Sequence, residues 1–169
     1  MKTSIPLCFR FASVIAAAFL ALSASAQTPL KHADKSFIEK AAKAGMKEID
    51  ISRVAVERTS DPRVRAFAEM LVADHSSAND ALAAIAASKG VHLPAKDVDG
   101  AEKWTKKSGK DFDEDYVEKM VSAHKEAVEL FEKEANNGED AETKAFARAT
   151  LPKLQHHLEV AIDLKKTVK

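Results

Sequence analysis

The chain has 169 residues with 26 basic and 26 acidic side chains, and its single cysteine is Cys8. Balanced charge leaves no basic excess to hold a polyanion, so we expect no nucleic-acid partner. Beyond Cys8 the sequence excludes disulfides, thiolate metal sites and cysteine nucleophiles, so a packed core must hold the domain together. Glycine is scarce (five residues) and no stretch alternates with the period of a strand, which predicts an all-α protein.

Residues 1–26 have the pattern of a cleaved secretory signal peptide. Lys2 and Arg10 form a positive region, residues 11–22 form an apolar run, and small residues end at Ala26, so cleavage is expected before Gln27. The apolar run is too short to span a bilayer, which takes about 20 residues, although an uncleaved anchor is the alternative. We therefore predict a periplasmic protein whose mature chain is one domain, residues 27–169, with no transmembrane helix. Its formal charge would be −2.

Four amphipathic segments, separated by turn signals, follow the signal peptide. The first helix is predicted over residues 34–59. Asp61 caps the second, Pro62 takes its first position, and Gly90 ends it after Lys89. The third covers residues 111–136, and the fourth covers residues 140–167 with Pro152 inside it as a kink. At 1.5 Å per residue, each helix would be about 40 Å long.

The connections between these helices predict the topology. The first and third are short, which favours antiparallel neighbours. The second, residues 91–110, is a loop long enough to cross the bundle from end to end. Hairpin, long crossover and hairpin make a ferritin-like four-helix bundle, and a simple up-down bundle with a decorated loop is the alternative. We expect Trp104 in this loop to plug one end, and the acidic run at residues 111–115 to stabilise a helix start.

Each predicted helix carries one ionisable side chain on its apolar stripe. At about 100° per residue the inward groups are Glu48, His75, His124 and His157. Each lies near the middle of its helix, so their levels agree within about one turn of 5.4 Å. The neighbouring His156 points roughly 100° away, so the doublet contributes one inward imidazole. An isolated buried charge is costly, so we expect the four side chains to meet in one layer.

Two interpretations of this layer follow. Three imidazoles and a carboxylate are donors that suit a transition metal such as Fe, Zn or Cu. Asp74, at the edge of its helical stripe, would then hold a ligating histidine from outside. Alternatively, Glu48 hydrogen-bonds two imidazoles and keeps a metal-free core neutral. The first interpretation predicts a metal-binding protein of envelope or stress physiology. The second predicts a non-enzymatic structural or interaction module of the cell envelope.

Four segments carry a family resemblance: FIEKAAKAGMKEI, VRAFAEMLVADHSSANDAL, FDEDYVEKMVSAH and KAFARATLPKLQHHLEVA. In this order they resemble DUF family 4142, exported bacterial proteins of unknown function that are often labelled as membrane or outer-membrane proteins. The resemblance covers about residues 33–165. It implies a ferritin-like four-helix bundle and no established reaction. The family's recurring Glu, its DH pair and its two later histidines fall on Glu48, Asp74 with His75, His124 and His157.

Ferritin-like di-iron proteins take a Glu-x-x-His pair from each of two helices. Here Val72, Val121 and Leu154 stand three residues before the inward histidines. We therefore expect no six-ligand di-iron chemistry; a mononuclear site or a polar core that has lost its metal stays open. Serines near the histidines lack the strand-to-helix turn of a nucleophile elbow, so no catalytic residue is assigned and a non-enzymatic role is favoured. The oligomeric state and any peripheral association with the cell envelope are left open.

Overall fold

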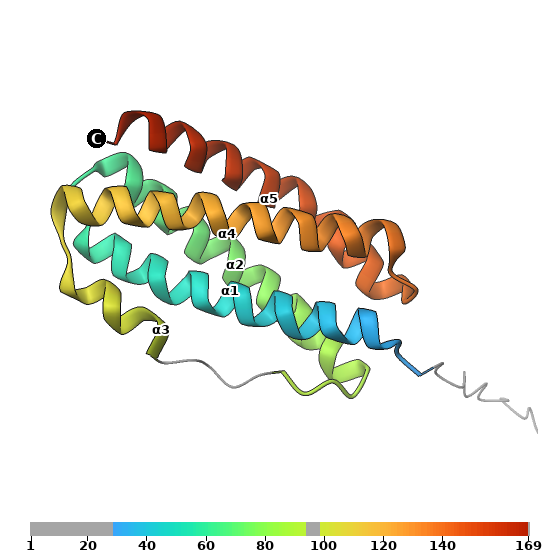
Figure 1. Cartoon of the computed structure of the whole chain (residues 1–169). Coiled ribbons are helices and arrows are strands. Elements are labelled where there is room, and N and C mark those ends of the chain that lie inside the picture. The colour runs from blue at the N-terminus through green and yellow to red at the C-terminus, as the bar shows by residue number, and fades with distance from the viewer. Residues whose placement is uncertain (1–28, 94–98, 169) are drawn as a thin grey trace, which may run out of the picture.

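A computed structural model describes residues 29–93 and 99–168; the predicted signal peptide lies outside the described residues. The long helices are α1 (His32–Arg58), α2 (Pro62–Ser88), α4 (Gly109–Asn137) and α5 (Ala141–Thr167). They form the predicted four-helix bundle (Figure 1), and their limits agree with the expected ones to within two residues. Among the described residues no helix is long and apolar enough to span a membrane.

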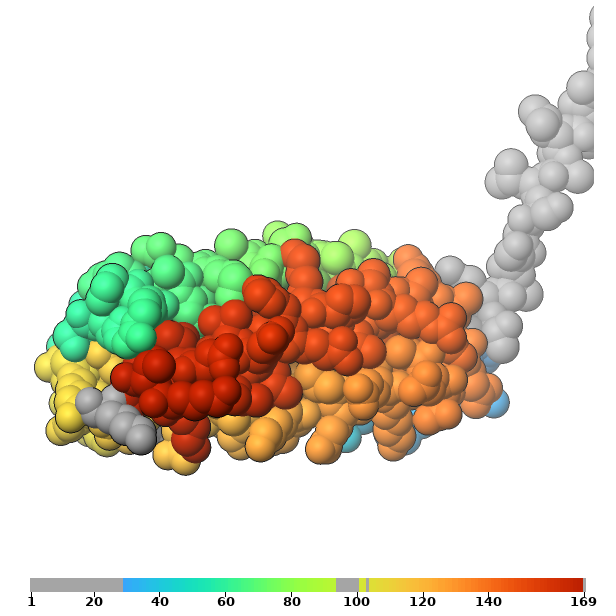
Figure 2. Space-filling model, turned by 90° about the horizontal axis from the view of Figure 1, so that it is seen from above, coloured from blue at the N-terminus to red at the C-terminus, as the bar shows by residue number. Residues whose placement is uncertain are grey.

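The order of the helices around the bundle is ferritin-like. The end of α1 lies beside the start of α4, where Thr59 contacts Asp113, and the start of α2 lies beside the end of α5, where Arg63 donates to Thr167 at 3.1 Å. The third long helix thus starts at the end where the first one finishes, which is the end of the bundle opposite to the C-terminal end of α2 (Figure 1). Seen from above, α5 lies between α2 and α4 (Figure 2). The crossover prediction is confirmed, and the up-down alternative is wrong.

The crossover is partly helical, which corrects the expectation of a plain loop. It contains α3 (Asp99–Glu102) and the 3-10 helix η1 (Lys103–Lys106). Trp104 is 9 % exposed, and its ring meets that of Phe112 at 6.1 Å between centroids. The indole joins the core cluster that contains Ile51 and Val64, so it covers the end of the bundle as expected. Burying a large apolar ring there anchors the crossover.

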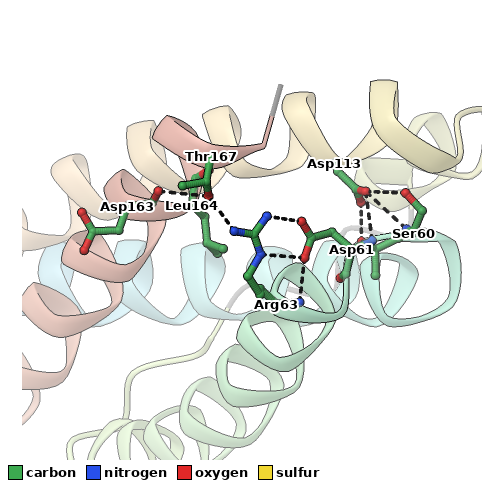
Figure 3. A network of polar contacts seen from close by, with 8 residues as sticks. Ser60, Asp61, Arg63, Asp113, Asp163, Leu164 and Thr167 are labelled. Carbon is green, nitrogen blue, oxygen red and sulfur yellow. Dashed lines mark hydrogen bonds and ion pairs between the residues drawn. The ribbon is translucent and has the colours of Figure 1, made fainter.

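A buried carboxylate organises the turn between α1 and α2 (Figure 3). Asp113 of α4 is 1 % exposed and accepts hydrogen bonds from Thr59, from the hydroxyl of Ser60 at 2.9 Å and from the backbone N–H of Asp61 at 3.2 Å. Asp61 in turn caps α2 by accepting from the N–H of Arg63 at 2.8 Å. The acidic run lies at the start of α4, with Asp111 in its first turn, and its member Asp113 additionally ties α4 to the α1–α2 turn.

Two apolar clusters fill the bundle on either side of its middle. One includes Phe67, Phe112 and Tyr116, and the other includes Phe37 and Phe131. Such burial of aromatic and aliphatic side chains is the main driving force for the fold. The glycine expected to end α2, Gly90, has φ of +66°, a conformation that residues with a Cβ rarely adopt. The clusters leave the level between them to polar side chains.

Candidate metal centre

The polar layer consists of one side chain from each long helix: Glu48 from α1, His75 from α2, His124 from α4 and His157 from α5. These residues are buried, with exposed fractions of 5 %, 7 %, 0 % and 2 % in that order. The three imidazole centroids lie 5.5, 5.4 and 5.3 Å apart, a nearly equilateral triangle. The four residues predicted from helical periodicity therefore meet at one level, and His156 is exposed as expected.

The tautomer of His124 follows from its backbone contact. Its Nδ1 lies 3.0 Å from the carbonyl oxygen of Met120, one turn earlier in α4. A carbonyl can only accept, so Nδ1 carries the proton and donates it. In the neutral ring, Nε2 is then left with its lone pair. This atom is buried and has no hydrogen-bond partner among the described residues.

A carboxylate outside the layer sets the tautomer of His157. Its Nε2 donates to Oδ2 of Asp74 at 3.0 Å, and the other oxygen of Asp74 accepts from Nζ of Lys153 at 2.6 Å. In the neutral ring, Nδ1 of His157 therefore carries the lone pair, again buried and without a hydrogen-bond partner in the described part of the chain. Carboxylates commonly hold metal-binding histidines in this way, from behind. Asp74 thus lies where an outer partner was expected.

Glu48 faces two of the imidazoles. Its Oε2 lies 2.8 Å from Nε2 of His75 and 3.6 Å from Nε2 of His124. The layer therefore contains four buried ligand atoms, one from each residue. Oε2 of Glu48 and Nε2 of His75 contact one another, whereas Nε2 of His124 and Nδ1 of His157 have no hydrogen-bond partner among the described residues. Such groups are rare in folded proteins and call for an explanation.

The charges of the layer favour a cation. Burial alone raises the pKa of Glu48, but the contact with His75 and the other imidazoles outweigh it, so the pKa of this carboxyl lies below its ordinary value. Burial lowers the pKa of His124 against the opposing effect of Glu48, and it lowers the pKa of His157 to about 4 against that of Asp74. An ionised carboxylate thus stands near the neutral imidazoles of His124 and His157, a buried negative charge that a metal ion would compensate.

The donor set fits a single metal ion. One nitrogen from each of the three imidazoles lies within 4.8 Å of the other two. With metal–nitrogen bonds of about 2.1 Å, nitrogens on a tetrahedral ion are about 3.4 Å apart, so the imidazole nitrogens would approach one another by up to about 1.4 Å. Small rotations of the side chains can supply this movement. Glu48 adds an oxygen donor on the same side as His75 and His124.

Two contacts of the layer do not follow from the helical pattern. They are the carbonyl of Met120 that orients His124, and Lys153 that holds Asp74. A signal for Lys153 exists in its spacing, because it precedes His157 by four residues and so lies on the same face of α5. The contact with Met120 leaves no signal, because every residue has a backbone carbonyl and only the rotamer of His124 selects this one.

The chain is similar to known proteins both in sequence family and in fold. The family model described as Domain of unknown function (DUF4142) matches residues 19–164. A search of curated proteins finds no match. Three solved structures share the fold at 13 to 16 % identity. They are a DUF305 fragment from Deinococcus radiodurans, CopM in its Cu(I)-bound form, and a conserved hypothetical protein from Mycobacterium tuberculosis.

These likenesses extend over most of each chain. The DUF305 fragment has 13 % identity and a TM-score of 0.72, covering 83 % of this chain and 99 % of its own. CopM has 16 % identity and a TM-score of 0.69, covering 79 % and 96 %. The mycobacterial protein has 16 % identity and a TM-score of 0.63, covering 80 % and 96 %. Identities this low show a common helical-bundle fold alone.

Proposed function

This chain belongs to the DUF4142 family, and from the residues of its polar layer we propose that it binds one transition-metal ion. The ligands are His75, His124, His157 and Glu48, and Asp74 orients His157 from outside the layer. The observation that carries this proposal is the set of four ligand atoms, one on each residue, buried at one level, of which Nε2 of His124 and Nδ1 of His157 have no hydrogen-bond partner among the described residues. A metal ion would use all four at once.

The donors indicate which metals to test first. Imidazole and carboxylate suit zinc, divalent copper and ferrous iron, whereas soft sulfur ligands select Cu(I). CopM has the same fold with Cu(I) bound, which makes copper worth including. The layer proposed here contains nitrogen and oxygen donors, so we expect divalent ions to bind more tightly than Cu(I).

Metal analysis of the purified protein tests the proposal. We expect about one equivalent of metal per chain after loading, and loss of that metal in His157→Ala, His75→Ala and Glu48→Gln. His156→Ala is the matched control, because the same side chain is removed from the adjacent exposed position and metal should be retained. Failure of iron, zinc and copper to bind stoichiometrically, even after reconstitution of folded protein, would overturn the proposal.

A metal-free structural module is the second candidate, favoured by the short distance between His75 and Glu48. That 2.8 Å contact places a compensating group beside the buried carboxylate without any ion. This candidate predicts that the histidine variants lose stability and that no ligand binds at the layer. Stoichiometric metal in the wild type and not in His157→Ala would rule it out.

We also propose that the protein is exported and acts at the bacterial envelope in metal handling or stress. The support is the signal-like pattern of residues 1–26, whose positive region, apolar run and small residues suit signal peptidase. Cell fractionation and N-terminal sequencing test this step. We expect a periplasmic protein that begins at Gln27. A chain that keeps its first residues, or stays in the cytoplasm, would contradict it.

A further inference from the structure

Beside the polar layer lies a small inner cavity of about 30 Å³ between α1, α2, α4 and α5. Glu48 and His75 line it on the side of the layer, and Ala78, Asn79, Phe131 and Leu154 line the rest. A water molecule needs roughly 10–15 Å³ of such space, so the inner cavity has room for two or three atoms. Most of its wall is apolar, and Nδ2 of Asn79 is a buried donor without a partner among the described residues.

An outer groove of about 390 Å³, open to solvent, lies next to the inner cavity between α1 and α4. Ala44, Glu48 and Ala127 line both the outer groove and the inner cavity, so they form the boundary between them. The outer groove is lined by three lysines, Lys40, Lys47 and Lys119, which make no ion pair within the part of the chain that the structure describes. Two acids also line it, Glu126 and, at the boundary with the inner cavity, Glu48. Its mouth is therefore positive, and positive clefts concentrate small anions.

The charge of a metal-loaded layer also favours the binding of a small anion. Three neutral imidazoles and one carboxylate leave a divalent ion with a net charge of +1. A net charge in a buried core is costly, and one monovalent anion bound to the ion would remove it. The protein supplies four ligands, and transition metals accept a fifth, so a coordination position is open to such an anion.

We propose that the metal site takes a small monovalent anion of two or three atoms, which enters through the outer groove and binds in the inner cavity. This inference rests on the proposed metal binding. Nδ2 of Asn79 donates to the bound anion, and Glu48 and His75 place the metal against it. The size of the inner cavity excludes larger ligands such as free imidazole.

Azide and cobalt test the proposal, because the visible spectrum of Co(II) changes with the number of its ligands. Full-length mature protein is loaded with Co(II), its cobalt content is measured, and azide is titrated while the spectrum is recorded. We expect a saturable change with azide and none with imidazole at equal concentration. The Ala78→Val variant narrows the inner cavity and leaves the outer groove intact, so its azide affinity should fall about tenfold or more.

Two further variants separate the inner cavity from its route of access. The Ala123→Val variant narrows the outer groove alone, so azide should bind more slowly with little change in affinity. The Ala84→Val variant is the matched control, an exposed alanine of α2 that lines neither space, and should bind azide like the wild type. Substitution of Lys47 and Lys119 by Gln should slow binding and weaken its dependence on salt.

The outcomes distinguish this inference from the proposed function. If cobalt binds stoichiometrically and azide leaves the spectrum unchanged, the anion site is refuted and the metal site stands. Equal azide affinity in Ala78→Val and in the wild type, both fully loaded and helical by circular dichroism, would also refute it. If cobalt does not bind to folded protein, the proposed function fails and this inference fails with it.

Discussion

At the scale of single residues, the orientation of the imidazoles depends on groups outside the polar layer. His124 is held by a carbonyl of its own helix, whereas His157 is held by Asp74 from another helix. Lys153 also holds Asp74, by donating to its other carboxylate oxygen. Burial by itself would raise the pKa of Asp74, but Lys153 and His157 together bring this pKa below its ordinary value, so the carboxylate stays ionised at neutral pH.

We expect Asp74→Asn to weaken metal binding without unfolding the protein. Removal of an outer partner of a ligating histidine typically costs about 10- to 100-fold in metal affinity. Competition with a chromogenic chelator measures this change. Asp80→Asn, an exposed substitution on the same helix, is the control and should bind metal like the wild type. Equal affinities in the two variants would mean that Asp74 does not support the site.

Glu134, near the end of α4, should make the stability of the protein depend on pH. Burial, contact with Asp34 and repulsion from that carboxyl raise the pKa of Glu134 to about 7. The pKa of a glutamate in the unfolded chain is about 4.3, so between pH 4.3 and pH 7 the folded state binds more protons than the unfolded state. The stability that protonated Glu134 contributes is therefore lost as the pH rises through 7. Glu134→Gln cannot ionise, so its stability relative to wild type should increase from pH 4.5 to pH 8 in urea unfolding. Exposed Glu132→Gln should show no such trend.

At the scale of helices, one buried carboxylate joins three of them. Asp113 of α4 receives hydrogen bonds from the turn between α1 and α2, and Asp61 and Arg63 continue the contacts to Thr167 of α5 (Figure 3). The end of the bundle that receives the crossover is therefore held by polar contacts as well as by Trp104. The opposite end is joined by Lys89, which donates to Asp140 at 2.8 Å.

Replacement of this carboxylate tests how much the turn depends on it. We expect Asp113→Ala to destabilise the protein by about 1–3 kcal/mol, because it removes the acceptor of the buried Thr59 hydroxyl and of the part-buried Ser60 hydroxyl and Asp61 N–H. Chemical unfolding followed by circular dichroism measures the loss. Glu114→Ala is the control, since the neighbouring side chain is exposed and should change stability by less than about 0.5 kcal/mol. Similar losses in both variants would point to α4 helicity instead.

At the scale of the whole molecule, the metal proposal couples the four helices. Every long helix supplies one ligand, so an ion at the layer would cross-link the two hairpins at mid-height. We expect the thermal midpoint to rise on metal loading and fall on chelation. Free metal at 100 times its dissociation constant adds about 2.7 kcal/mol to the folded state. The thermal midpoint of His156→Ala should respond to metal like that of the wild type, whereas that of His157→Ala should not change with metal.

Acid should destabilise the metal-free bundle through its buried imidazoles. The pKa of His124 and that of His157 lie below the unfolded value of about 6.5, so the unfolded state binds more protons as pH falls from there towards 4. The stability that these neutral imidazoles contribute is therefore fully present above pH 6.5 and is lost as the pH falls below it. Protonation of Glu134 stabilises the folded state over the same pH range. The thermal midpoint should therefore be measured in the Glu134→Gln variant, in which this effect is absent. An unchanged thermal midpoint from pH 7 to pH 5 would contradict buried neutral histidines.

The sequence determined the helices, the crossover and the layer, because these depend on local patterns. Caps and turn residues mark the ends of the helices, and the period of 3.6 residues gives both the direction and the height of Glu48, His75, His124 and His157. Connection lengths then predicted which helices are neighbours. Each of these properties depends on a short stretch of chain and can therefore be predicted from that stretch.

Which atoms face one another depends instead on how the helices pack together. The burial of Asp113, the bond from His157 to Asp74 and the free lone pair of His124 depend on rotamers that the packing of other helices selects. The inner cavity beside Glu48 is likewise a property of side chains from four helices. No local pattern contains such relations, since they arise when segments far apart in the chain pack together.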